Sequence, residues 1–331
     1  MNLPTMPAAR EFQRLTPDRA EALVPFIKAH RSIYDGQFNP DVPPDVLGDY
    51  FIHDLRQKFS EGVWAGLMHE PAGGGFAAAV FHHSAWDTNF FGFRMDRLDY
   101  LFGSHENAMD AVLCRYAGLS EKEGVRHISA RVNMSDRRTA SVLRQNGFAE
   151  VCVKSLWRHS LADPAAVQVP SPHIRAFSPQ DGDDVRVLAA TLAGAGRFSM
   201  DGRFDPKRVR EMYEQWAVHL CETAPAQVLV ARVRGATAGF LVFTVGVPLY
   251  GAPDVADLKP GVVTHVAVDP SLRGRGFGRA LIVAGLKRMC ELGARAAYAA
   301  TAAGNAAGAA AFQSAGFRPV TSHWDFHRWL D

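Results

Sequence analysis

Residues 262–278 read VVTHVAVDPSLRGRGFG, and the rest of the chain is organised around them. The segment 262–268 is mostly apolar and lies between two proline-containing turns, which is typical of a buried strand. A glycine-rich loop follows at once, and residues 279–292 then carry apolar side chains at the spacing of one helix face. This order of strand, glycine loop and helix leaves backbone N–H groups unpaired at the positive end of a helix, where phosphate groups bind readily.

The composition is that of a soluble globular protein. The chain has 331 residues, 47% hydrophobic and 21% charged, which is enough for two ordinary domains or one large one. A net charge of +2 and scattered basic residues give no electrostatic basis for nucleic acid or a membrane as the main partner. The N-terminus lacks the apolar core of a signal peptide, and no apolar stretch approaches about 18 residues, so we expect a cytoplasmic protein.

The cysteines and histidines predict neither disulfides nor a metal site. The four cysteines are widely separated and never form a CxxC pair, so we expect free thiols. His323 and His327 are four residues apart on a predicted strand without a carboxylate cluster nearby, so we expect no metal there.

An internal repeat divides the chain. Residues 147–161 read GFAEVCVKSLWRHSL and residues 316–330 read GFRPVTSHWDFHRWL, an ungapped match at an offset of 169. Near the start of each half, at Thr16-Pro17 and Ser178-Pro179, a hydroxyl N-cap and a proline precede a helical pattern. We therefore predict a tandem repeat of one α/β unit. The predicted parts are a first domain over 1–162, a proline-rich linker over 163–172 and a second domain over 173–331.

Both domains are predicted to be α/β (α+β), each with a mixed sheet flanked by helices. In the second domain the predicted helices are 181–193, 205–221, 279–292 and 306–315. The predicted strands are 227–233, 238–245, 262–268, 294–300 and 323–330. The first domain has the same frame, but its central region, residues 97–113, contains Gly103 alone and no comparable glycine loop.

The spacing of the glycines decides among three phosphate-binding motifs. A Walker A loop ends in Gly-Lys-Ser/Thr, whereas Gly278 is followed by Arg279. A dinucleotide fingerprint requires glycine where this chain has Leu281. The third motif, Arg-x-x-Gly-x-Gly, is matched from Arg273 through Gly276 to Gly278. An ordinary strand-to-helix turn is the structural alternative, but three alternating glycines exceed what such a turn needs.

The stretch from Val268 to Gly278 resembles the acyl-coenzyme A signature of the GNAT superfamily of N-acetyltransferases. The segment with Asn305, Phe312 and Gly316-Phe317 is similar to a second motif of the same superfamily. The resemblance implies acetyl-CoA as cosubstrate, bound by the second domain, and a degenerate first domain. It further implies that the strand splays from its neighbour to bind the pantetheine arm, while the loop amides hold the pyrophosphate. The coenzyme residues so implied are Val266, Ala267, Val268, Arg273, Gly274, Arg275, Gly276, Phe277, Gly278, Arg279, Asn305 and Phe312.

Acetyl transfer needs an oxyanion donor, a base and, in many enzymes, an acid. We expect a backbone N–H near Val266 to stabilise the oxyanion. Many superfamily members carry a Glu base on this strand and a Tyr acid on the last helix, whereas this chain has Thr264-His265 and Phe312 there. His265 is the candidate base because imidazole titrates near neutral pH, although a packed histidine is the alternative interpretation. Tyr298, on the neighbouring strand, is a further candidate; without an acid the thiolate leaves unassisted.

An aromatic stretch in the first domain, residues 84–93, reads SAWDTNFFGF. It is either a buried plug beside a turn or part of an acceptor site. It resembles the Trp-Asp/Glu-x-x-Phe-Phe-Gly segment of dTDP-fucosamine acetyltransferases, which acetylate the 4-amino group of a nucleotide-linked dideoxy sugar. The resemblance extends in patches to the chain's end. It implies apolar contacts to sugar or base from Trp86, Phe90, Phe91 and Trp216, and diphosphate contacts from Arg197 and Arg203.

The resulting hypothesis is an acetyl-CoA-dependent N-acetyltransferase for a primary amine of a small molecule, with a nucleotide-linked amino sugar as the leading acceptor. One alternative is another amine, such as an aminoglycoside, a polyamine or a mycothiol-type precursor. The other is a coenzyme A-binding module without catalysis, which the absent Glu and Phe312 favour. We expect a monomer or homodimer.

Overall fold

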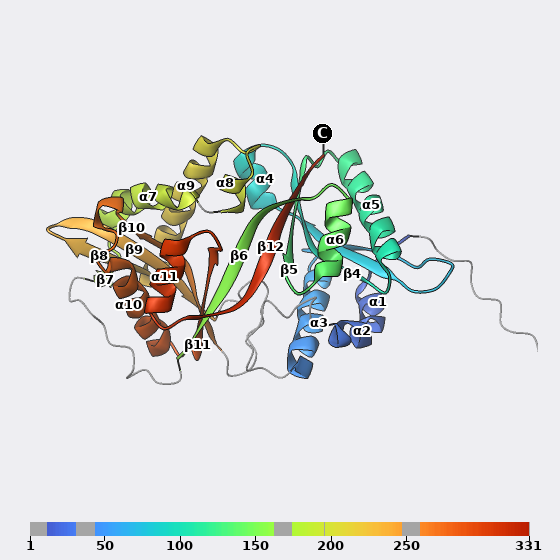
Figure 1. Cartoon of the computed structure of the whole chain (residues 1–331), viewed down its shortest axis with the longest axis horizontal. Helices are drawn as coiled ribbons and strands as arrows, with labels where there is room; N and C mark the ends of the chain where they lie inside the picture. The colour runs from blue at the N-terminus through green and yellow to red at the C-terminus, as the bar shows by residue number, and fades with distance from the viewer. Residues whose placement is uncertain (1–11, 31–43, 162–173, 195, 247–258, 331) are drawn as a thin grey trace, which may run out of the picture. The chain divides into compact units, whose positions relative to one another are not determined.

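The computed structural model describes residues 12–30, 44–161, 174–194, 196–246 and 259–330 (Figure 1). None of the helices in these residues has the length and apolar character needed to span a membrane. The chain forms two compact units: unit 1 comprises residues 1–151 and 323–331, and unit 2 comprises residues 152–322.

Unit 1 is a mixed sheet in the order β1-β2-β3-β4-β5-β12, in which β4 and β5 run parallel and the other neighbours antiparallel. Its strands are β1 (Gln13–Arg14), β2 (Ala65–His69), β3 (Ala77–His83), β4 (Met95–Gly103), β5 (His127–Asn133) and β12 (Arg318–Trp329). Its helices are α1 (Pro17–Ala22), α2 (Val24–Ala29), α3 (Pro44–Ser60), α4 (Ala85–Phe91), α5 (Glu106–Lys122) and α6 (Arg137–Gln145). Buried apolar residues of α5 and α6 pack on one face, and Phe51 of α3 packs against Tyr100 on the other.

Unit 2 repeats this arrangement as β7-β8-β9-β10-β11-β6, with β10 and β11 parallel and the other neighbours antiparallel. Its strands are β6 (Ala149–Ser160), β7 (Ile174–Ala176), β8 (Val228–Val233), β9 (Ala236–Val245), β10 (Pro260–Val268) and β11 (Ala296–Ala302). Its helices are α7 (Gly182–Ala190), α8 (Arg197–Met200), α9 (Pro206–Thr223), α10 (Phe277–Glu291) and α11 (Ala306–Ser314), with short 3-10 turns η4 (Pro179–Asp181), η5 (Thr191–Gly194), η6 (Pro225–Gln227) and η8 (Pro270–Leu272). The helices α7 and α9 cover one face of the sheet and α10 the other, because alternate residues of β8 and β9 enter two separate cores.

The predicted tandem repeat is confirmed. The segments β5-α6-β6 and β11-α11-β12 have identical lengths and lie 169 residues apart. Their helices begin alike, since Asp136 accepts a hydrogen bond from the Thr139 amide and Asn305 accepts one from the Gly308 amide, both at 3.0 Å. A side-chain oxygen at the N-cap satisfies one of the amides that the helix itself leaves unpaired.

The two repeats exchange their last strands. Strand β6, which ends the first repeat, pairs with β11 from Lys154 opposite Ala302 onward. Strand β12, which ends the second repeat, pairs with β5 from His323 opposite Asn133 onward, in the equivalent register. Each sheet is therefore completed by the other repeat.

This exchange corrects the predicted division into residues 1–162 and 173–331. The chain enters unit 2 at Cys152 and returns to unit 1 at His323. The predicted linker, residues 163–172, lies outside the described residues.

Unit 1 lacks the long glycine loop, as expected. Strand β4 ends at Gly103 and α5 begins at Glu106, whereas eight residues separate Val268, the end of β10, from Phe277, the start of α10. The first turn of α5 also carries the carboxylate of Glu106, while the first turn of α10 has no acidic residue. A carboxylate at a helix N-terminus occupies the electrostatic position that a phosphate would take.

Candidate active site

Strand β10 diverges from β11 in the middle of unit 2. Their parallel pairing ends at Val263 and Ala299, although both strands continue. At the same point Thr264 is an extra residue on β10, so that Val263 and His265 face consecutive residues of β9. A bulge of this kind bends a strand and increases its twist. The splay that the GNAT resemblance implied is therefore present.

The diverging part of β10 presents backbone groups to the side that β11 has left. The Asp269 amide donates to the Ala238 carbonyl at 2.9 Å. Hydrogen-bonding groups alternate along a strand, so Ala267 faces β9 as well. The N–H and C=O groups of Val266 and Val268 consequently face away from β9, where a ligand can pair with them.

The glycine loop joins β10 to α10. Gly274 and Gly276 have φ angles of 75° and 85°, a left-handed conformation that favours glycine. Gly276 is the N-cap of α10, and the first intrahelical bond runs from the Ala280 amide to the Gly276 carbonyl at 2.9 Å. The amides of residues 277–279 therefore point out of the helix end, as the phosphate-loop hypothesis requires.

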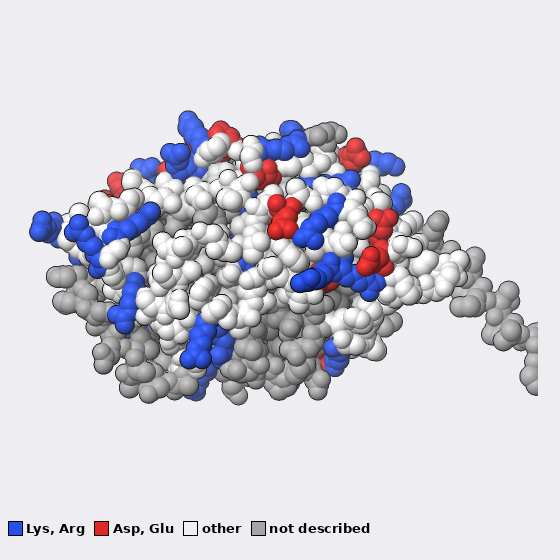
Figure 2. Space-filling view, in the orientation of Figure 1, with Lys and Arg blue, Asp and Glu red and all other residues white. Residues whose placement is uncertain are grey.

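Arginines surround this helix end. Arg273, Arg275 and Arg279 are exposed, and two of them are held by backbone carbonyls: Arg273 Nε donates to Val268 at 3.3 Å and Arg279 Nε to Ser314 at 2.9 Å. Figure 2 shows Lys and Arg side chains spread over the end of unit 2 where β8, β9 and α10 lie. The first turn of α10 has no acidic residue to offset this positive charge, although the Asp269 carboxylate at the start of the loop interacts with Arg273.

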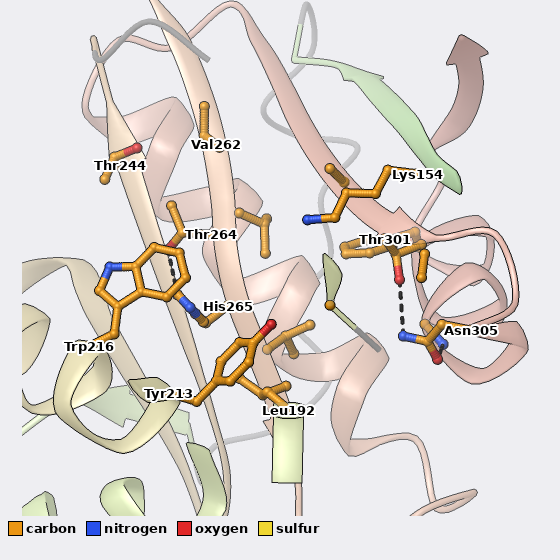
Figure 3. Close-up of a pocket in the computed structure, with 17 residues that line it drawn as sticks. Lys154, Leu192, Tyr213, Trp216, Thr244, Val262, Thr264, His265, Thr301 and Asn305 are labelled. Atoms are coloured by element: carbon orange, nitrogen blue, oxygen red, sulfur yellow. Dashed lines mark hydrogen bonds between the residues drawn. The ribbon is translucent and has the colours of Figure 1, made fainter. Parts of the chain in front are cut away.

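A pocket of about 400 Å³ opens where the two strands separate, and its lining comes from unit 2 alone. Figure 3 shows Trp216, His265 and Tyr213 on one side of this pocket and Lys154, Thr301 and Asn305 on the other. The predicted residues that it brings together are Thr264, His265, Val266, Asn305, Phe312 and Trp216.

His265 is buried and neutral. Its side chain is covered by the edge-on ring of Trp216, at 4.2 Å between ring centroids. Burial, assisted by the positive charge of Lys154, lowers the pKa of His265 to about 4.

The hydrogen bonds of Thr264 assign the tautomer of His265. The Thr264 hydroxyl donates to the Val242 carbonyl at 3.2 Å, so its oxygen is free to accept. The Nδ1 atom of His265 lies 3.3 Å from that oxygen and donates to it (Figure 3). A neutral imidazole with its proton on Nδ1 keeps Nε2 as an acceptor.

The Asn305 side chain is largely committed to local structure. Its Oδ1 caps α11 and its Nδ2 donates to the Thr301 hydroxyl at 3.0 Å. Gly308 permits this arrangement, because a Cβ there would lie 2.6 Å from Asn305 Nδ2. One N–H of the amide is left for a ligand, and the identity of this residue is explained in part by capping, as for Asp136 in the first repeat.

Two of the aromatic candidates do not supply an acid to the pocket. Phe312 lines it but is 4% exposed and packs against Trp157 and Phe317. Tyr298 lies on the part of β11 that still pairs with β10, in a buried cluster with Leu156, so the structure does not bring it to the pocket.

The predicted acceptor residues are distributed over both units. Trp86, Phe90 and Phe91 lie on α4 of unit 1, where Phe90 is buried and stacks on Trp86, whose side chain is 48% exposed. In unit 2, Arg197 begins α8 and lies over the Phe198 ring, while Arg203 is exposed. Neither arginine lines the pocket.

Sequence reasoning missed Lys154, Tyr213 and Thr301. Tyr213 lies one helical turn before Trp216 on α9, so the spacing of these two aromatic residues was the signal that could have placed both on one helix face. A Cβ on Gly196 would lie 2.3 Å from the Tyr213 hydroxyl, so the glycine makes room for this ring. No sequence signal could have placed Lys154 in this pocket, because the residue comes from the first repeat and reaches unit 2 only through the strand exchange.

The fold that carries this site is that of the GNAT acetyltransferases. A GCN5-related N-acetyltransferase from Sphaerobacter thermophilus superposes with a TM-score of 0.60 and 15% identity, covering 98% of this chain and 97% of that one. A tandem GNAT protein of the clavulanic acid biosynthesis pathway superposes with a TM-score of 0.52 and 15% identity, covering 96% and 98%. A glucosamine N-acetyltransferase region of a fungal multi-domain β-N-acetylglucosaminidase gives 0.61 and 14%, covering 98% of this chain and 38% of that one.

Residues 196–317 match the family model described as the acetyltransferase (GNAT) family. The match lies within unit 2 and includes the diverging strand β10, the glycine loop, α10 and α11. It supports acetyl transfer as the general class of reaction. No curated protein is significantly similar to the chain.

Proposed function

We propose that unit 2 is an acetyl-CoA-dependent N-acetyltransferase that acts on a primary amine of a small molecule. The observation that carries this proposal is the divergence of β10 from β11, which is continuous with the glycine loop at one end and opens into the pocket beside His265. A single ligand that reaches from the phosphate-binding end of α10 into this gap must contain a pyrophosphate joined to a long polar arm.

The chain's own groups match such a ligand. The amides of residues 273–279, with the exposed arginines, would hold the pyrophosphate of coenzyme A. The backbone of Val268 and the remaining N–H of Asn305 would pair with the pantetheine arm. Bound coenzyme supplies the acetyl thioester, and the Val266 N–H would then stabilise negative charge that develops on its carbonyl oxygen.

His265 would act late in amine attack. With a pKa of about 4, its imidazole is too weak a base to take a proton from a free ammonium group, whose ordinary pKa is about 10. The acceptor must therefore attack as the neutral amine, after its ammonium proton has been lost to solvent. Its nitrogen becomes far more acidic once it has bonded to the carbonyl carbon, and Nε2 would accept the second proton then. The coenzyme A thiolate would leave without an acid, since thiols of pKa about 8.5 are adequate leaving groups.

For the acceptor, we keep an amino sugar linked to a nucleotide as the leading candidate. Tyr213 and Trp216 present ring surface beside His265, and aromatic faces of this kind pack against sugars and bases. The fungal region that superposes on this chain is described as a glucosamine N-acetyltransferase. Arg197 and Arg203 in unit 2, with Trp86, Phe90 and Phe91 in unit 1, are retained as further acceptor contacts.

Calorimetry with acetyl-CoA, followed by an amine panel assayed for release of free thiol, tests the proposal. We expect binding of acetyl-CoA and amine-dependent release of coenzyme A. Absence of binding at millimolar acetyl-CoA would overturn it.

A second candidate is a coenzyme A-binding module without catalysis. It is favoured by Phe312, which puts an apolar ring where many family members carry a tyrosine acid. Binding of acetyl-CoA without thiol release from any amine would support this module and reject the enzyme.

A further inference from the structure

Lys154 places a positive charge in the pocket. The residue lies on β6, and its half-buried side chain extends toward β10 from the wall that also carries Thr301 (Figure 3). It is near enough to His265 to lower the pKa of the imidazole.

The described lining of the pocket gives this charge no counterion. Among the residues that the structure describes, none that lines the pocket is an aspartate or glutamate, and His265 is neutral at pH 7. No carboxylate among the residues that the structure describes forms an ion pair with Lys154. An anionic ligand in the pocket would supply the counterion that these residues do not, and a charge-assisted hydrogen bond to it would be favourable.

Neither the fold nor the coenzyme accounts for the charge. At the position equivalent to Lys154, the second repeat has His323, which is 5% exposed and whose pKa burial lowers to about 4. The exchanged strand therefore pairs equally well with a neutral side chain. The phosphates of coenzyme A are assigned to the glycine loop, where Arg273, Arg275 and Arg279 lie.

We propose that Lys154 binds an anionic group of the acceptor, so that the substrates are amines that also carry a carboxylate or phosphate. This inference rests on the proposed function and names its substrate class. A polycation such as a polyamine or an aminoglycoside would bring further positive charge next to Lys154, and the described lining has no carboxylate to receive it. An amino sugar bearing a phosphate meets the requirement.

The test compares matched amines that differ by one anionic group: glucosamine 6-phosphate with glucosamine, and β-alanine with β-alaninamide. For the full-length protein we expect kcat/KM for at least one anionic amine to exceed that for its neutral partner roughly tenfold or more, the worth of a charge-assisted hydrogen bond. In Lys154→Met this ratio should fall toward one, and Lys154→Arg should keep a preference. The control is Lys287→Met, which removes an exposed lysine of α10 outside the pocket and should keep the wild-type ratio.

Calorimetry of the same four amines into the coenzyme A complex gives a second readout that needs no turnover. The proposal is wrong if neither anionic amine is turned over or bound better than its partner, or if Lys154→Met keeps the preference. Turnover without charge preference would reject this inference and leave the proposed function standing. Failure to bind acetyl-CoA would reject both.

Discussion

The buried His265 predicts a stability that depends on pH. Its pKa is about 4 in the folded protein, against about 6.5 in an unfolded chain. Between these values the unfolded chain binds a proton that the folded protein does not, so the free energy of unfolding rises with pH. Above pH 6.5 the imidazole is neutral in both states and does not reduce the free energy of unfolding. As the pH falls from 6.5 toward 4, protonation of the unfolded chain lowers that free energy. The linkage relation gives a loss of about 2 kcal/mol between pH 7 and pH 5 from this one group.

Urea unfolding of the full chain at pH 7, 6 and 5 measures this effect. His323 of unit 1, also with a pKa of about 4, contributes a similar loss, so His265→Gln should remove about half of the combined dependence. The matched control is His219→Gln, which replaces an exposed histidine of α9 and should keep the wild-type dependence. If His265→Gln loses as much stability between pH 7 and pH 5 as the wild type, the inferred burial of a neutral imidazole is wrong.

Three further outcomes are expected. A fragment of residues 173–331 lacks β6 and the buried Trp157 and Leu161 of the unit 2 core, which should reduce the free energy of unfolding by roughly 5 kcal/mol or more. Circular dichroism should therefore show no cooperative melting of the fragment. A folded fragment that binds acetyl-CoA would contradict this. Gly276→Val puts a branched residue at a φ of 85° and should weaken acetyl-CoA binding tenfold or more by calorimetry, whereas Gly62→Val, at a φ of 70° in unit 1, should cost similar stability, about 1–2 kcal/mol, and leave binding unchanged. Trp216→Ala uncovers His265 and should raise its pKa toward 6.5 in an NMR titration; an unchanged value would show that other residues bury the ring.

The glycine loop was predictable because its signals are local. Glycines that need a left-handed φ, and the start of α10 directly after them, are both encoded within a few residues. The same holds for the caps Asp136 and Asn305, which occupy equivalent positions of the repeat.

The strand exchange was not predictable from the sequence, because similar repeats present similar edges. Strand β6 could pair with β5 or with β11 in the same register, and nothing within β6 distinguishes the two edges. Lys154 was missed for that reason. The position of Tyr298 outside the pocket has another cause. Strand β10 leaves β11 at the bulge at Thr264, and Tyr298 lies before that point.

The exchange also determines the order in which the two units can finish folding during synthesis. Strand β12 completes unit 1, yet the ribosome makes it only after the whole of residues 152–322, which form unit 2. Until then β5 has an unpaired edge, and open edges favour pairing with other chains. Unit 2 has all its strands as soon as β11 and α11 have emerged, so the part of the protein that is translated first is the last to finish folding.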